Sequence, residues 1–398
     1  MGSMSDMIET FGGHIMSPVP DPYPAYARLR RDEPVKCMDL PLGPTYLVTR
    51  YDDVLAVLRD NALFSSAING RGIGLVMGRT IIEMDAKEHT RHRNIVSMNF
   101  VPKALQGDLP AHIGRVANEL IDRFAADGGA DIVEQFTKTF PLRVIAHVIG
   151  IPIDDYETFQ RWSLDIIGFT SDPPRGFAAS NAIVEFLRPI IEDRQAHPAA
   201  DLLSTLVHAE VDGHRLTEEE VYSFLRLLLP AGAETTQRLI GTTLFALLSH
   251  REQFEAVLAD RSQLAWAIEE ALRWEAPVQF AARNATADTV IAGTAIPTES
   301  QVMVAIGSAN RDERHYDSPA RFDIRRHADD HLSFGFGRHF CLGSHLARME
   351  ATTALNAFFD RLPHLRLDPA APPPQVVGLA FRSPDRVPVR FDRTPGAV

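Results

Sequence analysis

The chain has 398 residues, of which 45% are hydrophobic, and a formal net charge of −12. This length suits one large domain or two ordinary ones, and the acidic balance argues against a nucleic-acid partner, which needs a basic face. The two cysteines are too few for a disulfide framework or a cysteine-rich zinc site. No apolar run approaches the roughly 18 residues that span a bilayer, and no secretory signal is recognisable, so we expect a cytoplasmic protein without a membrane anchor.

Helical patterns dominate the chain. Apolar residues recur at helical spacing in the segments 24–32, 52–60, 111–129 and 180–195. Thr217 and Glu220 have the spacing of a capping box, which predicts that the longest helix begins there. This helix extends to residue 250 in spite of Pro230, which is unusually long for a globular protein. We therefore expect it to cross the molecule through its core.

Strand patterns are short and lie towards the two ends of the chain. They occupy residues 44–50, 289–297 and 387–392. The sequence contains no internal repeat and no low-complexity linker. We predict a single domain over residues 1–398 that is mainly α with a minor β part, in which residues 1–3 are a cloning remnant.

A glycine-rich turn, FGFGRHFCLG at residues 334–343, contains one of the two cysteines. The apolar spacing after Cys341 predicts that a helix begins there, and the free N–H groups and positive dipole end of a helix favour a thiolate. Gly335, Gly337 and Gly343 permit backbone angles that bring N–H groups close to the sulfur.

Three interpretations of Cys341 are open. It is a buried structural cysteine, a nucleophile paired with His339 or His345, or a thiolate ligand of haem iron, which needs a protected and hydrogen-bonded sulfur. Residues 334–343, written FGxGxHxCxG, resemble the haem-ligand signature of the cytochrome P450 superfamily at every defining position. The resemblance implies the cytochrome P450 fold, with the long helix crossing the haem face, and haem b with Cys341 as its axial ligand.

A second motif is Glu270-x-x-Arg273. An isolated acid and base at this spacing form a surface ion pair on a helix. About 70 residues before the cysteine turn, however, the motif resembles the buried ExxR pair of the family, which holds the core behind the haem together with a further arginine. Arg321 and Arg325 are the candidates for that third residue. A buried pair should not tolerate loss of one partner, because the other charge would be stranded.

A third motif lies in the middle of the long helix, where Ala231, Gly232, Glu234 and Thr235 occur together. Glycine and threonine are poor helix formers, so the segment by itself indicates a helix bend or a close helix crossing at Gly232. The resemblance instead implies an oxygen-binding groove. Ala231 and Gly232 would leave room for O2, the Thr235 hydroxyl would hydrogen-bond the bound oxygen, and Glu234 would relay protons to it.

A fourth motif places His89 and Arg93 on one face of a helix. In isolation this is a solvated basic face. The resemblance implies that the pair binds the haem propionates together with Arg283 and His339, since arginine forms bidentate charge-assisted hydrogen bonds to carboxylates. It also implies that Phe334 packs beside the sulfur and limits access of water.

The resemblance covers essentially the whole chain and implies a bacterial-type haem-thiolate monooxygenase. Such an enzyme inserts one oxygen atom from O2 into a hydrophobic substrate, by hydroxylation or oxidative dealkylation. Two alternatives are a peroxide-driven peroxygenase, which usually lacks an acid–alcohol pair such as Glu234 and Thr235, and a haem-thiolate redox or gas sensor, which normally carries an output domain.

No reductase is fused within this sequence, so electrons from NAD(P)H are expected to arrive through a ferredoxin, or a flavodoxin, and its reductase. Such a partner is usually acidic and docks on the cysteine side of the haem. The basic residues that we expect to receive it are Arg93, Lys103, Arg338 and Arg348.

The substrate residues are predicted from the segments that line the pocket in the family. They are mostly apolar, which favours a terpenoid, steroid, fatty acid or aromatic substrate: Leu75, Val76, Ile167, Phe169, Leu228, Val278, Phe280 and Phe381. Arg71, Arg79 or Arg382 are candidates to anchor a carboxylate. The glycine-rich segment 65–82 is a candidate lid.

Overall fold

The computed structural model describes residues 9–11, 16–40, 43–153, 155–211 and 213–393. The expected cloning remnant at residues 1–3 lies outside them. The helices are α2 (Tyr23–Asp32), α3 (Tyr51–Arg59), α4 (Gly74–Met77), α5 (Ala86–Ser97), α6 (Leu109–Asp122), α7 (Phe140–Ile149), α8 (Tyr156–Ile167), α9 (Pro173–Ala196), α10 (Leu202–His208), α11 (Glu218–Ser249), α12 (Arg251–Ala259), α13 (Leu264–Trp274), α14 (Ile306–Ala309) and α15 (Ser344–Arg361). The 3-10 turns are η1 (Ala67–Arg71), η3 (Arg261–Gln263), η4 (Ile324–Arg326) and η5 (Gly337–His339), and η2 (Val133–Thr137) is π-helical.

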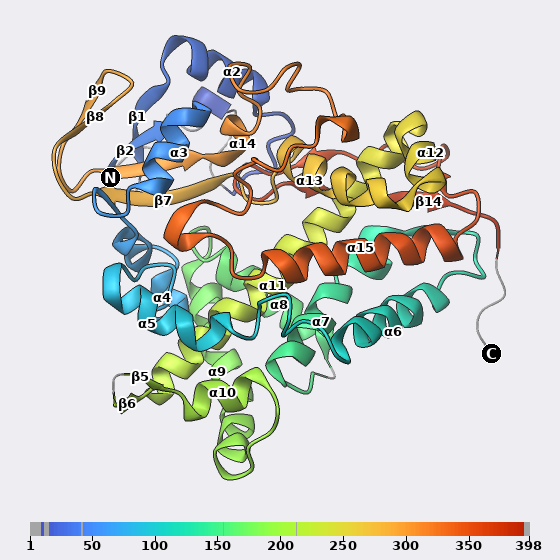
Figure 1. Ribbon diagram of the computed structural model, residues 1–398, viewed down its shortest axis with the longest axis horizontal. Coiled ribbons are helices and arrows are strands. Elements are labelled where there is room, and N and C mark those ends of the chain that lie inside the picture. Colours follow the sequence, from blue (N-terminus) through green and yellow to red (C-terminus); the bar gives the residue numbers. More distant parts are fainter. Residues whose placement is uncertain (1–8, 12–15, 41–42, 154, 212, 394–398) are drawn as a thin grey trace.

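The strands are short and form several small sheets. They are β1 (Val35–Leu40), β2 (Gly43–Val48), β3 (Phe64–Ser65), β4 (Gly129–Asp131), β5 (Glu210–Val211), β6 (His214–Arg215), β7 (Phe280–Ala285), β8 (Thr289–Ile291), β9 (Thr294–Ile296), β10 (Gln301–Ala305), β11 (Arg366–Leu367), β12 (Val376–Val377), β13 (Ser383–Pro384) and β14 (Pro388–Arg390). The largest sheet has the order β1-β2-β10-β7-β3, in which β10 runs parallel to β2 and the other pairs are antiparallel. The prediction of a mainly helical protein with a minor β part is confirmed (Figure 1).

The long helix α11 runs through the middle of the molecule and packs against α7, α8, α13 and α15 (Figure 1). Its capping box is formed as predicted, because the Glu220 N–H donates to Thr217 Oγ1 at 3.2 Å and the Thr217 N–H donates to Glu220 Oε2 at 2.7 Å. The helix stays continuous through Pro230, which is buried. A proline inside a helix costs about 3 kcal/mol, so tertiary packing, rather than local preference, sustains this element.

Several sequence-based boundaries need correction. The helix expected over 111–129 ends at Asp122, and the chain turns at Gly128, with a φ of +75°, before entering β4. The helix expected from residue 180 begins at Pro173, because Asp172 caps it by accepting from the Arg175 N–H. The single strand expected over 289–297 is the hairpin β8–β9, since φ is positive at both turn residues between the strands.

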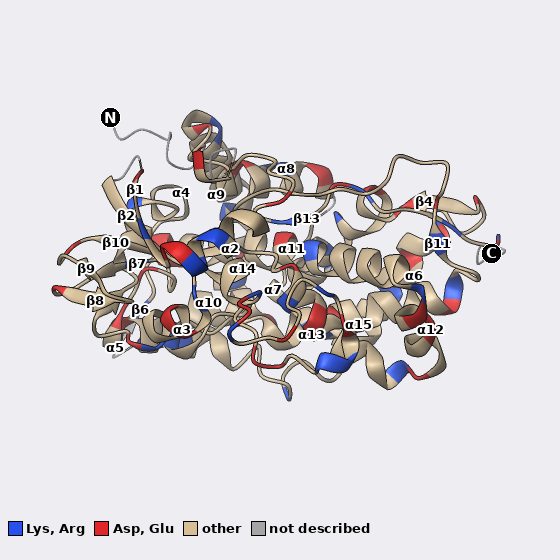
Figure 2. Cartoon of the chain, turned by 90° about the horizontal axis from the view of Figure 1, so that it is seen from above, with Lys and Arg blue, Asp and Glu red and all other residues tan. Residues whose placement is uncertain are grey.

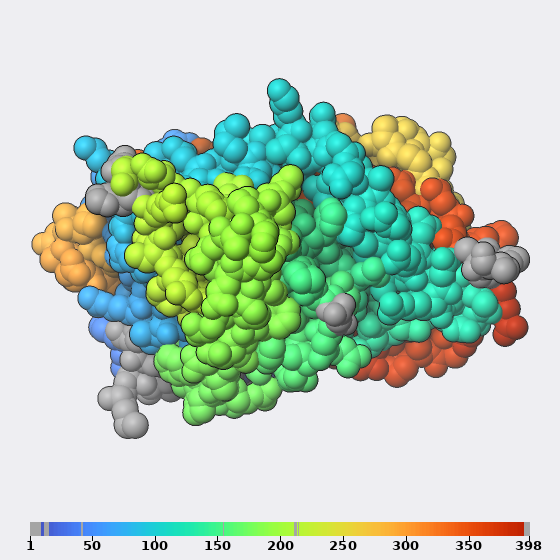
Figure 3. All heavy atoms as spheres, turned by 90° about the horizontal axis from the view of Figure 1, so that it is seen from below, coloured from blue at the N-terminus to red at the C-terminus, as the bar shows by residue number. Residues whose placement is uncertain are grey.

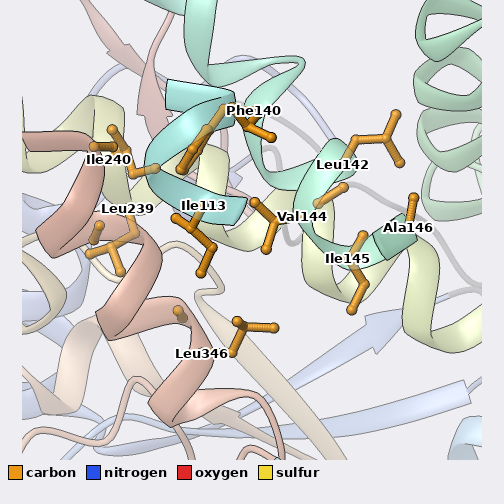
Figure 4. Packing of buried hydrophobic residues seen from close by; sticks show 14 of the residues in the cluster. Ile113, Phe140, Leu142, Val144, Ile145, Ala146, Leu239, Ile240 and Leu346 are labelled. Carbon is orange, nitrogen blue, oxygen red and sulfur yellow. The ribbon is translucent and has the colours of Figure 1, made fainter. Parts of the chain in front are cut away.

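The largest hydrophobic core surrounds α11. Side chains from α6, α7, α11 and α15 gather there, including Ile113, Val144, Leu239 and Leu346 (Figure 4). Each such side chain contributes about 1.5–3 kcal/mol when it leaves water. Among the described residues, no helix combines the length and apolar character needed to cross a bilayer.

Charged residues are distributed along the whole molecule, and the middle of the chain forms much of one face. Residues of both charge signs occur over the whole length of the molecule (Figure 2). Seen from below, the segment that carries α8, α9 and α10 covers a large part of the face (Figure 3). The core helix α11 contacts α8, α9 and α10 of this segment and also packs against α15.

Candidate active site

The cysteine turn has the local structure that its glycines predict. Gly335 and Gly337 both have a φ of +71°, in the left-handed region that favours glycine. The Cys341 N–H donates to the Phe334 carbonyl oxygen at 2.8 Å, and the Gly343 N–H donates to the sulfur. Helix α15 begins at Ser344, directly after the turn.

Cys341 does not have the surroundings of a nucleophile. Burial raises the pKa of its thiol, although the Gly343 N–H and the cations Arg93 and Arg348 act in the opposite direction. The His339 ring hydrogen-bonds Ser66 Oγ at 3.0 Å instead of the sulfur, and His345 is exposed. A nucleophilic cysteine needs a lowered pKa or an adjacent base, so this interpretation loses its support.

A cavity of about 650 Å³ lies between the cysteine turn and the middle of α11. Cys341 and Phe334 line it from the turn, and Ala231, Gly232 and Thr235 line it from the helix. The remaining lining is mainly apolar. The two motifs, which lie about 100 residues apart in the sequence, therefore face the same cavity.

Arg93, Arg283 and His339 line the cavity, and His89, which does not line it, packs against His339 with 4.3 Å between the ring centres. His89 is 1% exposed, and neither of its ring nitrogens has a hydrogen-bond partner among the described residues. Arg283 is also buried, and its Nε likewise has no hydrogen-bond partner among them. Burial and the neighbouring arginines lower the pKa of His89 to about 4 and that of His339 to about 3. The unsatisfied nitrogens of His89 and Arg283, together with the cation Arg93, suit an anionic ligand.

The motif in the middle of α11 lines the cavity and also packs closely against α7. A Cβ atom at Gly232 would lie 2.7 Å from Ile145 Cγ1 on α7, so only glycine fits there. The structural interpretation of Gly232 thus holds, and the residue still lines the cavity together with Ala231. The Thr235 hydroxyl donates to the Ala231 carbonyl oxygen at 2.8 Å, a bond within the helix.

Glu234 is not among the residues that line the cavity. It is 1% exposed, and neither carboxyl oxygen has a hydrogen-bond partner among the described residues. The nearest cation is Arg238, whose Nη2 lies 3.6 Å from Glu234 Oε2. Burial raises the pKa of Glu234, while Arg238 and Lys138 partly oppose the rise.

The ExxR motif is a fully buried ion pair. Glu270 and Arg273 have no exposed side-chain surface and form two hydrogen bonds, of 2.7 and 2.8 Å. Arg273 also donates to the carbonyl oxygens of Asn310, Pro319 and Arg321. The pair therefore joins α13 to the loop that precedes η4.

The third arginine of this cluster is Arg326, so the prediction of Arg321 or Arg325 is wrong. Arg326 Nε donates to Glu270 Oε1 at 3.3 Å. The Arg321 side chain is 67% exposed and contributes only its carbonyl oxygen, and Arg325 is exposed. Within the 3-10 turn η4, neighbouring side chains point in different directions, so one position decides which arginine turns inward.

A second buried cluster was not anticipated from the sequence. Glu269 forms two hydrogen bonds to Arg348, of 2.6 and 2.7 Å, and one of 3.0 Å to His331. Burial alone would raise the pKa of Glu269, but these hydrogen bonds outweigh it and lower the pKa to about 2. The Arg348 guanidinium also lies 4.4 Å from the centre of the Phe334 ring. Arg348 therefore supports the cysteine turn, while 32% of its side chain remains exposed.

The family model described as Cytochrome P450 matches residues 154–378, more than half of the chain. That stretch contains the α11 motif, the ExxR pair and the cysteine turn. The chain belongs to the cytochrome P450 family.

Bacterial P450 relatives resemble the chain over most of its length. The polyketide biosynthesis cytochrome P450 PksS of Bacillus subtilis is 35% identical over 365 residues, which cover 87% of this chain and 90% of that protein. The monooxygenase PikC of Streptomyces venezuelae is 37% identical over 357 residues, with coverage of 87% and 85%. The crystal structure of P450BioI, in complex with an acyl carrier protein ligated to hexadec-9Z-enoic acid, has a TM-score of 0.85 at 31% identity and covers 94% and 99% of the two chains. This P450 is thus an oxidoreductase of the bacterial monooxygenase type.

P450 enzymes bind haem through a cysteine thiolate, and the residues around the cavity fit that group. Among the described residues, Cys341 is the cysteine that lines the cavity, whereas Cys37 is exposed on β1. The unsatisfied nitrogens of His89 and Arg283 offer the donors that two propionates need. The apolar walls suit the faces of a porphyrin.

The predicted substrate residues of this P450 divide into two groups. Six of them line the cavity, and they come from the end of α8 and the loop after it, from α11, from the start of β7 and from the β-bridge between residues 278 and 381: Ile167, Phe169, Leu228, Val278, Phe280 and Phe381. Leu75 is 56% exposed and Val76 is buried away from the lining, so these two predictions are wrong for this cavity. The helical turn α4 directs Leu75 outward, and its neighbours Ile73 and Met77 line the cavity instead.

The arginines proposed to anchor a substrate carboxylate do not line the cavity of this P450. Arg382 is 1% exposed and binds Glu275 at 2.7 Å and the Val19 carbonyl oxygen at 2.8 Å. Arg79 forms hydrogen bonds of 2.7 and 2.6 Å to Glu88. Arg71 lies exposed at the end of η1.

Proposed function

We propose that this P450 inserts one oxygen atom from O2 into a small to medium hydrophobic organic substrate, with haem b bound to Cys341. The observation that carries the proposal is that Cys341 and Thr235 line opposite parts of one largely apolar cavity. Hydroxylation and oxidative dealkylation are the reactions that such a cavity serves.

Several side chains of this chain are proposed to hold the cofactor. His89, Arg93, Arg283 and His339 bind its propionates, and Phe334 shields the sulfur from water. Gly335 and Gly343 shape the turn, and Ala231 and Gly232 leave space on the opposite side. Bound haem supplies the iron at which dioxygen is activated.

The acid–alcohol pair of α11 is proposed to move protons. Burial raises the pKa of Glu234, which makes its carboxyl group easier to protonate than an exposed one. A general acid works best when its pKa lies near the working pH. Thr235 Oγ1 lines the cavity and presents a hydroxyl group that can accept and pass on this proton. This pair is the reason for preferring O2 over peroxide as the oxidant.

The substrate class is proposed from the cavity and from the relatives. The lining residues Ile167, Phe169, Leu228 and Phe381 offer no charge, so the bound part of the substrate is apolar. PksS is named for polyketide biosynthesis, and P450BioI has been solved with a fatty acid on a carrier protein. We extend this class to the present chain as aliphatic polyketide-like or fatty-acid-like compounds.

Electrons are proposed to come from NAD(P)H through a ferredoxin or flavodoxin and its reductase, in the cytoplasm. Two of the predicted basic residues are exposed: Arg338 lies in the cysteine turn, and Lys103 lies after α5. Arg93 lines the cavity and Arg348 binds Glu269, so neither is available in the same way. The exposed ring of Phe336, with Arg59 over it at 5.2 Å, adds an apolar contact.

A visible absorption titration of the haem-loaded protein tests the proposal. We expect a thiolate-ligated spectrum that Cys341→Ala abolishes, and a shift from low to high spin with aliphatic polyketide-like or fatty-acid-like compounds. Cys37→Ala is the matched control and should leave the spectrum unchanged, because Cys37 is exposed on β1. An unaltered spectrum in Cys341→Ala would refute the ligand, and a shift with polar compounds alone would refute the substrate class.

A further inference from the structure

Arg238 lies one helical turn after Glu234 on α11 and contacts two groups of a distant segment. Its Nη1 donates to Ser383 Oγ at 3.1 Å, and its guanidinium carbon lies 5.6 Å from the centre of the Phe381 ring. Its Nη2 lies 3.6 Å from Glu234 Oε2. This last distance exceeds that of an N–H···O hydrogen bond. The guanidinium is therefore anchored to Ser383, close to Glu234 but not bonded to it.

The segment that anchors Arg238 is bonded to neighbouring parts of the chain and forms part of the cavity wall. Phe381 lines the cavity and pairs with Val278 in a β-bridge. The Arg382 N–H donates to the Pro277 carbonyl oxygen at 3.1 Å, and the Arg382 side chain is buried against Glu275. The position of the guanidinium is thus set by the wall against which a substrate would pack.

Few other charges act on Glu234. On its own helix the charged neighbour is Arg238, and from the segment after η2 it is Lys138, which pairs with Glu134. From α8, the uncharged side chain of Gln160 hydrogen-bonds Gln237 on α11 at 3.4 Å. Arg238 is the nearer of the two cations, and its Nε has no partner among the described residues.

We propose that Arg238 is a positioning residue, held by Ser383 and Phe381 so that its guanidinium stays beside the Glu234 carboxyl group without closing into a tight ion pair. The inference rests on the proposed role of Glu234 as a proton carrier. A tight pair would hold the carboxyl group as a carboxylate, and no cation at all would leave burial unopposed. The anchored guanidinium keeps Glu234 between these two states.

Removal of the Arg238 cation and removal of its Ser383 anchor should have opposite effects on the titration midpoint of Glu234. Arg238→Gln removes the cation, so the titration midpoint should rise by about 1–3 pH units, the usual influence of an opposite charge at this distance. Ser383→Ala frees the guanidinium to approach the carboxyl group, so the midpoint should fall. Arg251→Gln is the matched control, because Arg251 forms an exposed i,i+4 pair with Glu255 on α12.

The midpoint can be measured by infrared spectroscopy of the haem-loaded protein over a pH series. The C=O stretch of protonated Glu234 is the band that disappears in Glu234→Gln. Opposite shifts in Arg238→Gln and Ser383→Ala, with none in Arg251→Gln, would support the proposal. An unmoved band in Arg238→Gln, or a rise in Ser383→Ala, would overturn it. If Arg238→Gln does not fold, Arg238→Lys serves instead. The single ammonium group of lysine cannot contact Ser383 and lie beside Glu234 as the two Nη atoms of arginine do. The titration midpoint of Glu234 should therefore also move in Arg238→Lys.

Product formed per NAD(P)H consumed separates this inference from the proposed function. A loss of yield is expected in both Glu234→Gln and Arg238→Gln, with peroxide appearing in its place. If Glu234→Gln keeps the full yield, the proton-carrier role fails, and the infrared shifts alone judge the positioning by Arg238. If Glu234→Gln loses yield while Arg238→Gln changes neither the band nor the yield, the positioning role fails alone.

Discussion

The buried ExxR pair allows a quantitative prediction for Glu270→Ala. Glu270 accepts hydrogen bonds from Arg273, Arg326 and the Asp323 N–H, and its side chain has no exposed surface. Its removal leaves the Arg273 guanidinium buried with only carbonyl oxygens as partners. Breaking a buried pair in this way costs about 3–5 kcal/mol, which is a large part of the 5–15 kcal/mol typical of a folded domain. We expect the variant to unfold at a clearly lower urea concentration, with a midpoint lower by on the order of 1 M.

Urea unfolding followed by circular dichroism measures this effect, on the haem-loaded protein and at matched haem content. The control is Glu255→Ala, which removes one partner of the exposed pair with Arg251 and should cost about 0.3–0.5 kcal/mol. A midpoint for Glu270→Ala that lies within error of the Glu255→Ala midpoint would refute the reasoning. It would mean that water or a neighbouring group satisfies Arg273 after the carboxylate is lost.

Three further predictions concern other charged residues. Arg326→Ala should lower the urea midpoint, whereas Arg325→Ala should leave it unchanged, because Arg326 alone of the two bonds Glu270; equal midpoints would contradict the assignment. Arg93→Ala should speed the loss of haem to an acceptor protein, since the side chain lines the cavity beside the other donors; an unaltered rate would remove Arg93 from the propionate site. Glu269, with a pKa lowered from 4.5 to about 2, contributes stability that is present above pH 4.5 and lost as the pH falls towards 2. At 1.36 kcal/mol per pKa unit this is about 3 kcal/mol, so acid unfolding of Glu269→Gln should be flatter in that window, and an unchanged slope would count against the cluster.

Much of the site could be predicted from local sequence patterns. The capping box at Thr217, the turn at Cys341 and the helix after it depend on residues close together in the chain, and all three are present. The resemblance to the P450 signature then linked these local elements to one cavity. Local patterns were sufficient wherever a residue's role depends on its immediate neighbours.

The failures arose where orientation or distant partners decide the role. Arg325 lies one position from the inward-facing Arg326, and Leu75 lies two positions from the cavity-lining Ile73 and Met77, because a short helical turn points nearby side chains in different directions. The hydrogen bonds of Arg348 to Glu269 were not anticipated, because the two residues lie 79 positions apart in the sequence. Composition and spacing carry no information on such long-range pairs, which only the folded chain reveals.

Some buried polar groups have hydrogen-bond partners within the chain and others do not, and this difference affects which parts of the protein depend on the cofactor. The clusters around Glu270 and Glu269 are complete without any ligand, whereas His89 and Arg283 retain buried nitrogens that have no partner within the described chain. We therefore expect the two clusters to depend little on the cofactor. The buried nitrogens of His89 and Arg283 should gain their partners from an anionic group, so cofactor binding should stabilise α5 and β7 more than the part of the core behind the cysteine turn.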